Sequence, residues 1–313
     1  MHWHPVCSLA ALVGCIVLLL GAEYMAEGQS SGSRIVVVSS SKAAPYEEAF
    51  TGLQQALRQQ GVRAQVDMHI LEGDTARVRA ALRALSPDDV LVTLGTSAMQ
   101  QAHAGAPTLP LVAGMILSAD ELQGLPNATG VFLEFPWEVQ VQWLRRLLPT
   151  TKTLGILYNP KENSRRIEAA KRAARDLGFV VEVEEVHDAK ELPVALENLG
   201  KRIEVLWGVV DDLVLNPQTA KQILLFSFQN RIPLVGLSTA WVKAGALYAL
   251  EWDYTDIGHQ CGEMVVQILG GTSARAIPPA APRKVLYTLN QKTARHMKID
   301  LPESLVRGAR EVF

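Results

Sequence analysis

Short polar side chains follow apolar runs of this sequence at several places, and they are the residues best suited to hold a small ligand. Pairs of this kind are Ser40-Ser41, Thr96-Ser97, Asn163-Ser164 and Asp211-Asp212. Hydroxyl groups and the free N–H groups of helix starts favour an anion such as a carboxylate. The carboxylates of Asp211-Asp212 favour an ammonium group instead. Together these groups would fit a zwitterion of amino-acid size.

We expect the ligand-binding residues to come from these positions and from side chains beside them. The candidates are Ser40, Ser41, Tyr46, Gly95, Thr96, Ser97, Met115, Phe135, Asn159, Asn163, Ser164, Asp211 and Ser238. Further aromatic residues that could stack on a ligand are Trp137, Trp207, Trp241 and Tyr254. The alternative is a purely structural role, because Ser, Thr, Asn and Asp are common helix caps. Tyr46 and Trp137 also fit helical stripes that face a core.

Sequence motifs of catalysis, phosphate binding and metal binding are missing. The sequence has no phosphate-binding loop, no G-x-G-x-x-G after a strand and no G-x-S-x-G, since Gly236–Ala240 lacks the second glycine. The histidines of the body are scattered without the spacing of metal ligands. No nucleophile or further carboxylate is placed relative to Asp211-Asp212 by the sequence. We therefore predict that the protein is not an enzyme and has no cofactor or metal ion.

The elements that must position these residues occur twice in the chain. In Arg34–Ile70 and again in Thr153–Val186, an apolar run is followed by a polar loop, an amphipathic helix, a glycine and a second strand. In the second copy the polar loop is Tyr158–Asn163, and the helix is expected to begin near Ser164. Repeated strand–helix alternation is typical of parallel sheets covered by helices. Since ligands bind at the carboxyl ends of such strands, a cleft between the two copies is the expected site.

The sequence predicts two lobes whose chain passes between them more than once. Gly130–Phe135 and Leu247–Glu251 are extended runs that we interpret as crossovers. Val285–Leu289 is expected to be a last strand. The expected division is lobe 1, residues 34–134 and 250–282, and lobe 2, residues 135–249 and 283–313.

Residues 1–33 are expected to lie outside this fold as a signal peptide or membrane anchor with a short linker. Val6–Ala22 is a nearly continuous apolar run, which is typical of an export signal or an uncleaved anchor. Cys15 leaves open a lipid attachment. The body contains a single cysteine, Cys261, which we interpret as a core residue. We expect a periplasmic or other extracytoplasmic location, with membrane anchoring left open.

Composition favours a folded protein and disfavours a nucleic-acid partner. The 313 residues are 48% hydrophobic and 20% charged, with a formal net charge of −2. Electrostatic binding of nucleic acid requires a basic excess, which this chain lacks.

Several blocks of the sequence together resemble the ABC-transporter substrate-binding family of largely uncharacterised transport systems, some members of which bind tryptophan or other aromatic amino acids. The blocks are Leu154–Pro160, Glu162–Ser164, Ile232–Leu247, Asp253–Met264 and Ile299–Val312. The resemblance implies a type I periplasmic-binding-protein fold: an α/β architecture of two Rossmann-like lobes with parallel sheets, joined by a three-crossover hinge.

The same resemblance implies where a ligand would lie. Ligand sites of the family follow the first, third and fourth strands of each lobe, which points to Ser40-Ser41, Thr96-Ser97, Asn159, Asn163-Ser164, Asp211 and Ser238. The chain departs from the family in Trp207–Asp212, which lacks the proline-containing loop usual after that strand.

We therefore predict the extracytoplasmic solute-binding component of an ABC importer, which captures an amino acid or small aromatic acid by hinge closure. Its partners would be the small-molecule ligand and an ABC permease in the membrane, with no nucleic acid, and we expect a monomer. The main alternative is a membrane-tethered ligand-sensing module, which an uncleaved Val6–Ala22 would favour. An enzyme on the same scaffold would need a nucleophile or metal-binding motif, which this sequence lacks. A sugar-responsive DNA regulator of related fold would need DNA-binding helices where this chain has an apolar leader.

Overall fold

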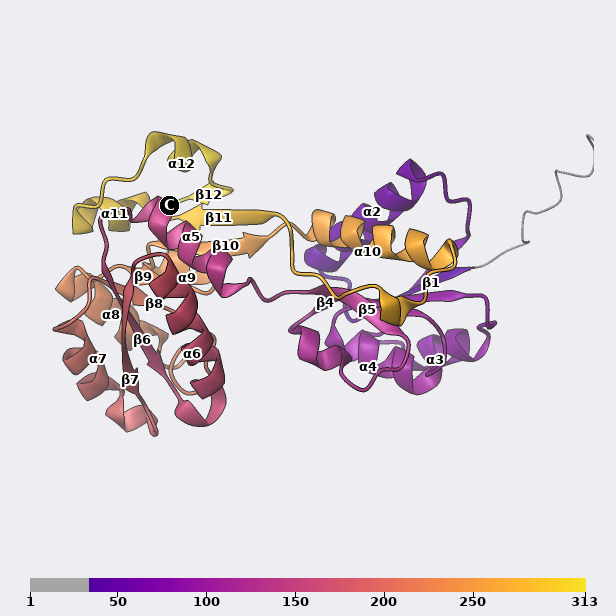
Figure 1. Ribbon diagram of the computed structural model, residues 1–313, viewed down its shortest axis with the longest axis horizontal. Helices are drawn as coiled ribbons and strands as arrows, with labels where there is room; N and C mark the ends of the chain where they lie inside the picture. Colours follow the sequence, from indigo (N-terminus) through magenta and orange to yellow (C-terminus); the bar gives the residue numbers. More distant parts are fainter. Residues whose placement is uncertain (1–33) are drawn as a thin grey trace, which may run out of the picture.

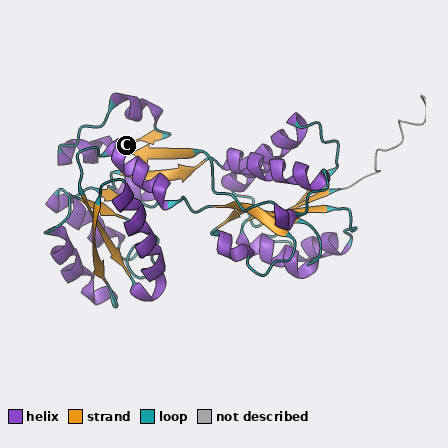
Figure 2. Ribbon diagram, in the orientation of Figure 1, coloured by secondary structure: helices purple, strands orange, loops and turns teal. Residues whose placement is uncertain are grey.

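Two α/β lobes, joined by three crossings of the chain, make up the computed structural model of the protein, which describes residues 34–313 (Figure 1). In each lobe the strands lie in the middle and helices cover both sides, as Figure 2 shows. The expectations for the apolar leader concern residues 1–33 and fall outside the described part. None of the helices described for residues 34–313 is long and apolar enough to span a membrane.

The first lobe contains a five-stranded parallel sheet of order β2-β1-β3-β4-β5. Its strands are β1 (Ile35–Ser39), β2 (Val66–Ile70), β3 (Val90–Leu94), β4 (Leu111–Ile116) and β5 (Ala128–Phe132). Its helices are α2 (Ala44–Gln59), α3 (Thr75–Arg83), α4 (Thr96–Gly105), the short η1 (Ala119–Leu122), and α10 (Tyr254–Leu269), which comes from late in the chain. α2 and α10 pack on one face, and α3 and α4 on the other (Figure 1).

The second lobe contains a seven-stranded sheet of order β12-β11-β10-β9-β8-β6-β7, in which β11 is antiparallel to β10 and the other pairs are parallel. Its strands are β6 (Thr153–Tyr158), β7 (Val180–Glu185), β8 (Val205–Trp207), β9 (Leu234–Val235), β10 (Tyr248–Trp252), β11 (Val285–Leu289) and β12 (Glu311–Val312). The helices are α5 (Trp137–Leu147), α6 (Pro160–Asp176), η2 (Ala189–Glu191), α7 (Leu192–Gly200), α8 (Ala220–Asn230), α9 (Thr239–Ala244), α11 (Gln291–Met297) and α12 (Glu303–Gly308). The predicted α/β class is confirmed.

The chain passes between the sheets after β5, after β10, and again between η3 (Ala274–Ala276) and β11. We call these segments the first, second and third crossovers. The two extended runs interpreted as crossovers are partly strands: β5 covers the first half of Gly130–Phe135, and β10 covers most of Leu247–Glu251. That interpretation was therefore wrong in part, because each run first completes the edge of its own sheet before the chain leaves it.

Two glycines bring α10 into backbone contact with α2. A Cβ atom on Gly258 would lie 1.7 Å from the carbonyl oxygen of Ala49, and one on Gly52 would lie 1.8 Å from that of Thr255. No side chain fits in such a gap, so these glycines allow the two helix backbones to touch. The segment that follows the second crossover is therefore fixed tightly to the first lobe.

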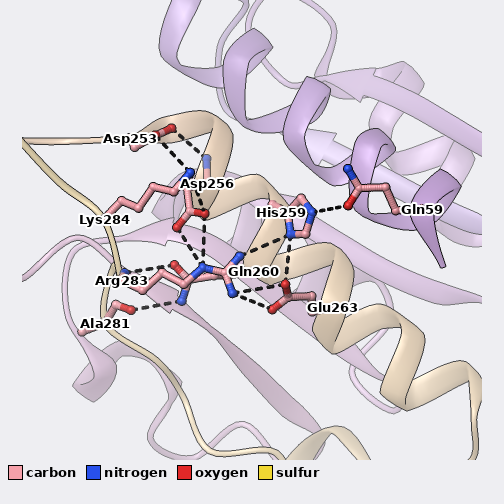
Figure 3. Close-up of polar contacts among 9 residues, drawn as sticks. All are labelled: Gln59, Asp253, Asp256, His259, Gln260, Glu263, Ala281, Arg283 and Lys284. Atoms are coloured by element: carbon pink, nitrogen blue, oxygen red, sulfur yellow. Dashed lines mark hydrogen bonds and ion pairs between the residues drawn. The ribbon is translucent and has the colours of Figure 1, made fainter. Parts of the chain in front are cut away.

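A polar network attaches the third crossover to α10 (Figure 3). The guanidinium of Arg283 donates to Asp256 at 3.1 Å and to Glu263 at 3.0 Å. Gln260 donates to the carbonyl oxygen of Ala281 and accepts from the backbone N–H of Arg283. Burial raises the pKa of Glu263, but the hydrogen bonds and charge of Arg283 outweigh it and lower this pKa below its usual value. The network therefore holds residues 281–283 against the first lobe.

One helix of the second lobe begins earlier than the sequence analysis predicted. α6 starts at Pro160 rather than near Ser164, and Asn159 caps it by accepting a hydrogen bond from the backbone N–H of Lys161. Proline suits the first helical position because its missing N–H would have no partner there. Of the residues predicted as a polar loop, Tyr158 ends β6, Asn159 is the cap, and residues 160–163 form the first turn of the helix, in which Lys161 and Glu162 are exposed. Asn163 consequently lies within the helix.

Candidate functional site

A cavity of about 510 Å³ lies between the lobes, beside the first and second crossovers. The first lobe contributes Leu117, Ser118 and Asp120, and the ends of β8 and β9 in the second lobe contribute residues 207–210 and 235–237. The crossovers and their flanking elements supply Leu133, Glu134, Phe135, Trp137, Gln140, Leu250 and Trp252. Small-molecule sites typically occupy about 300–1,000 Å³, so this cavity has the size of one.

Aromatic rings form much of the cavity wall. Phe135 of the first crossover and Trp252, the last residue of β10, stack with their ring centroids 5.6 Å apart and an interplanar angle of 9°. Trp137 meets Trp207 edge to face, with centroids 5.5 Å apart. The indole N–H of Trp252 donates to the carbonyl oxygen of Leu133 at 2.5 Å, which ties the two crossovers together. These flat apolar surfaces are suited to a ligand with an aromatic ring.

One arginine lines the same cavity, and the sequence analysis missed it. The guanidinium of Arg166, in α6, donates to Glu134 at 3.0 Å and to Asn163 at 3.1 Å. It also lies 5.8 Å from the ring centroid of Trp137. The signal in the sequence is its position one helical turn after Asn163, which places both side chains on one face of α6.

The candidate residues Asn163 and Asp211 lie side by side and bind each other. The carboxylate of Asp211, 1% exposed, accepts hydrogen bonds from the backbone N–H groups of Asn159, Leu213 and Val214 at 2.7, 3.0 and 2.8 Å. It also accepts one from the side-chain amide of Asn163 at 2.8 Å. Asn163 is fully buried. These polar groups therefore hold the loop after β8 against the start of α6.

The neighbouring polar groups of this edge also have protein partners. Ser164 donates its hydroxyl to the carbonyl oxygen of Pro160 within α6. Glu162 accepts a hydrogen bond from the backbone N–H of Asp212, and partial burial together with the charges of Asp211 and Asp212 raises its pKa. Among residues 34–313, no group of three or more His, Cys, Asp or Glu side chains could hold a metal ion.

In the first lobe, several candidates gather at the carboxyl edge of the sheet. The Ser40 hydroxyl accepts a hydrogen bond from the backbone N–H of Ala98 at 3.0 Å. Gly95 has φ of 92°, and a Cβ there would lie 2.6 Å from the Ser40 hydroxyl and 3.1 Å from the Tyr46 ring. Glycine is therefore required for this turn on both conformational and steric grounds. Thr96, half-buried, and the exposed Ser97 follow it at the start of α4.

The remaining candidates are dispersed. Ser41 donates its hydroxyl to Glu72, Met115 is buried in β4 with φ of 60°, and Ser238 precedes α9 without a side-chain cap. Among all predicted site residues, Phe135 lines the cavity. Two of the other proposed stacking residues, Trp137 and Trp207, line it as well. The structure thus groups Ser40, Tyr46 and Gly95 in the first lobe and Asn159, Asn163 and Asp211 in the second, and Phe135 alone among the candidates lines the cavity.

Comparison with known proteins places these features in a family. Residues 35–313 match the family described as ABC transporter substrate binding protein. The tyrosine-binding protein of Clostridioides difficile (strain R20291) is 21% identical over 266 residues, covering 80% of this chain and 76% of that protein.

Solved structures with the same fold include a ligand-free, open substrate-binding protein with adhesive properties from Clostridium difficile. It has a TM-score of 0.72 and 21% identity, covering 90% of this chain and 99% of that one. Another is an ABC domain in complex with L-Trp from Streptococcus pneumonia, with a TM-score of 0.56 and 24% identity, covering 90% and 100%. The predicted type I periplasmic-binding-protein fold is confirmed. With its family matched over nearly the whole described length, the chain belongs to the ABC transporter substrate binding protein family.

Proposed function

We propose that this protein is the extracytoplasmic solute-binding component of an ABC importer and that it captures an aromatic amino acid between its lobes. The family makes it a solute-binding protein, and the finer assignment is supported by one observation: the cavity at the crossovers combines aromatic walls with an arginine–carboxylate pair. A tyrosine-binding relative and an L-Trp complex among the related structures agree with this ligand class. An ABC permease would be the membrane partner.

The proposed mechanism is capture by closure of two lobes, with lobe 1 comprising residues 34–134 and 250–282 and lobe 2 comprising residues 135–249 and 283–313. The ligand ring would lie against Phe135, Trp137 and Trp252 beside the crossovers. Closure would then bring the edge that carries Thr96 and Ser97 toward the ligand from the first lobe. A ligand that binds the closed form better than the open form shifts the population toward closure by its difference in affinity.

The experiment is a thermal-shift screen followed by calorimetric titration with L-Trp, L-Tyr, L-Phe, L-Leu, L-Ala and D-ribose. We expect the aromatic amino acids to raise the melting temperature most, because a ligand that binds only the folded state stabilises it. Trp137→Ala should weaken binding by about tenfold or more, the equivalent of roughly 1.4 kcal/mol of lost ring contacts.

The matched control is Phe228→Ala, which removes an exposed aromatic ring of α8 that does not line this cavity. This variant should bind as the unaltered protein does. A screen in which ribose or an aliphatic amino acid stabilises the protein more than any aromatic amino acid would contradict the proposed ligand class. Equal loss of affinity in both variants would contradict the proposed location.

A further inference from the structure

Among the described residues that line the cavity, Arg166 is the one with a cationic side chain, and neighbouring groups hold it in a defined position. Its guanidinium donates to the side-chain oxygen of Asn163 at 3.1 Å and to Glu134 at 3.0 Å. Its side chain is 38% exposed, and that of Glu134 is 35% exposed. The arginine is therefore accessible from the cavity while its hydrogen bonds to Asn163 and Glu134 hold it in place.

The orientation of Asn163 is fixed from within the second lobe. Its amide nitrogen donates to the carbonyl oxygen of Val210 at 3.1 Å and to the carboxylate of Asp211 at 2.8 Å. Asp211 is itself fixed by three backbone N–H groups of the neighbouring loops. With both amide protons engaged, the side-chain oxygen of Asn163 is turned to Arg166, so this buried chain of hydrogen bonds holds the guanidinium at the cavity wall.

The second partner of Arg166, Glu134, lies outside the second lobe and is not buried. Glu134 belongs to the first crossover, a segment that connects the lobes, and it touches the guanidinium through one of its oxygens at 3.0 Å. Ion pairs between half-exposed side chains contribute little, because water competes for both partners. A ligand carboxylate enclosed in the cavity could take both donors of a guanidinium at once, which is the stronger arrangement.

We propose that Arg166 binds the carboxylate of the ligand and that Glu134, displaced from this pair, accepts the ligand's ammonium group. The assignment rests on the proposed function and extends it to the residues that recognise the amino-acid backbone. It leaves no charge unpaired: the arginine, the ligand carboxylate, the ligand ammonium and the glutamate alternate in sign. Asp120, the other acid lining the cavity, is exposed and accepts a hydrogen bond from Gln123. The Trp137 ring beside the guanidinium would contact the ligand's side chain.

The test compares an aromatic amino acid with the amine and the acid derived from it, using L-Trp, tryptamine and indole-3-propionate. Each is titrated calorimetrically into the full-length protein and into Arg166→Gln, Arg166→Lys and Glu134→Gln. The control is Arg165→Gln, which removes the neighbouring exposed arginine that does not line the cavity. Thermal melting of each variant without ligand establishes that it is folded.

Arg166→Gln should bind L-Trp and indole-3-propionate about 10-fold to 100-fold more weakly, as expected for loss of charge-assisted hydrogen bonds, and tryptamine within about threefold of the unaltered protein. Arg166→Lys should recover part of the loss. Glu134→Gln should weaken L-Trp and tryptamine but not indole-3-propionate. Arg165→Gln should bind all three as the unaltered protein does.

An equal loss of all three compounds in Arg166→Gln would mean that the arginine only supports the structure, and unchanged affinities would remove it from the site; either result overturns the assignment. These results differ from failure of the proposed function, which would appear in the unaltered protein as no binding of L-Trp, L-Tyr or L-Phe. That result would refute both the proposed function and this assignment.

Discussion

Asp211→Asn should destabilise the second lobe strongly, although it changes one oxygen for a nitrogen. One carboxylate oxygen accepts from the backbone N–H of Asn159 and the amide of Asn163, and the other accepts from the backbone N–H groups of Leu213 and Val214. An asparagine keeps one acceptor oxygen and turns an NH2 group toward the remaining two donors. Hydrogen bonds to charged groups contribute about 1.5–3 kcal/mol each, so the loss of two amounts to about 3–6 kcal/mol. Burying a neutral amide costs less than burying a carboxylate, which favours the lower end, about 3 kcal/mol.

Urea unfolding followed by tryptophan fluorescence and far-UV circular dichroism measures this change, since Trp207 is buried just before the loop. With a slope of about 1–3 kcal/mol per molar urea, the midpoint should fall by about 1 M or more. The control is Asp212→Asn at the next residue, whose side chain is exposed, and which should change the free energy of unfolding by less than about 0.5 kcal/mol. If the two variants unfold at the same urea concentration, the hydrogen-bonded role of Asp211 is refuted.

Three further outcomes follow from other contacts. Gly258→Ala should lower the melting temperature sharply or prevent folding, because its Cβ would lie 1.7 Å from the carbonyl oxygen of Ala49. The control Gly270→Ala, whose Cβ would have its nearest contact at 3.4 Å, should change the melting temperature little. Thermal melts of both variants measure the difference, and equal melting temperatures would contradict this reasoning. Hydrogen bonds from two backbone N–H groups at the start of β6 lower the pKa of Glu204. The carboxylate therefore contributes to stability above the pKa that it has in the unfolded chain, and this contribution is lost as pH falls through the lowered value. Glu204→Gln should flatten the decline in unfolding free energy between about pH 5 and 3, and an unchanged slope would contradict this. Burial raises the pKa of Cys261 to about 12, so a thiol reagent should modify it only after unfolding, as site-resolved mass spectrometry would show; rapid labelling of the native protein would be the opposite result.

The wound sheets could be predicted because buried parallel strands are continuous apolar runs. Ile35–Ser39 and Val90–Leu94 are such runs, and every residue in them is buried. The repeat of this pattern after Thr153 predicted the second sheet. The edge strand β12 was not predicted, since Val285–Leu289 was expected to be the last strand: β12 spans two residues and pairs with β11, from which α11 and α12 separate it in the chain. The start of α6 was missed because a polar first turn resembles a loop.

The cavity could be predicted only in part, because it forms from segments that are distant in sequence. Phe135 was among the expected ligand-binding residues, Trp137 and Trp207 were proposed as stacking residues, and all three line the cavity. Trp252 and Arg166 were not predicted: their roles depend on how the crossovers meet and on the pairing of Arg166 with Glu134. The side chain of Asn163 is buried and hydrogen-bonds to Val210 and Arg166, and its role in ligand binding stays a prediction.

The contact between α2 and α10 limits how the lobes could move relative to each other in the proposed closure. β10 ends at Trp252 and α10 begins at Tyr254, so Asp253 alone separates the seven-stranded sheet from a helix whose backbone touches the first lobe. So short a join allows rotation but little translation. In the proposed closure, groups close to this join, among them the stacked rings of Phe135 and Trp252, would keep their spacing, while Thr96, which follows the central strand β3, would move farther. In the proposed mechanism the aromatic wall would therefore be the part of the site that is already assembled before the lobes close.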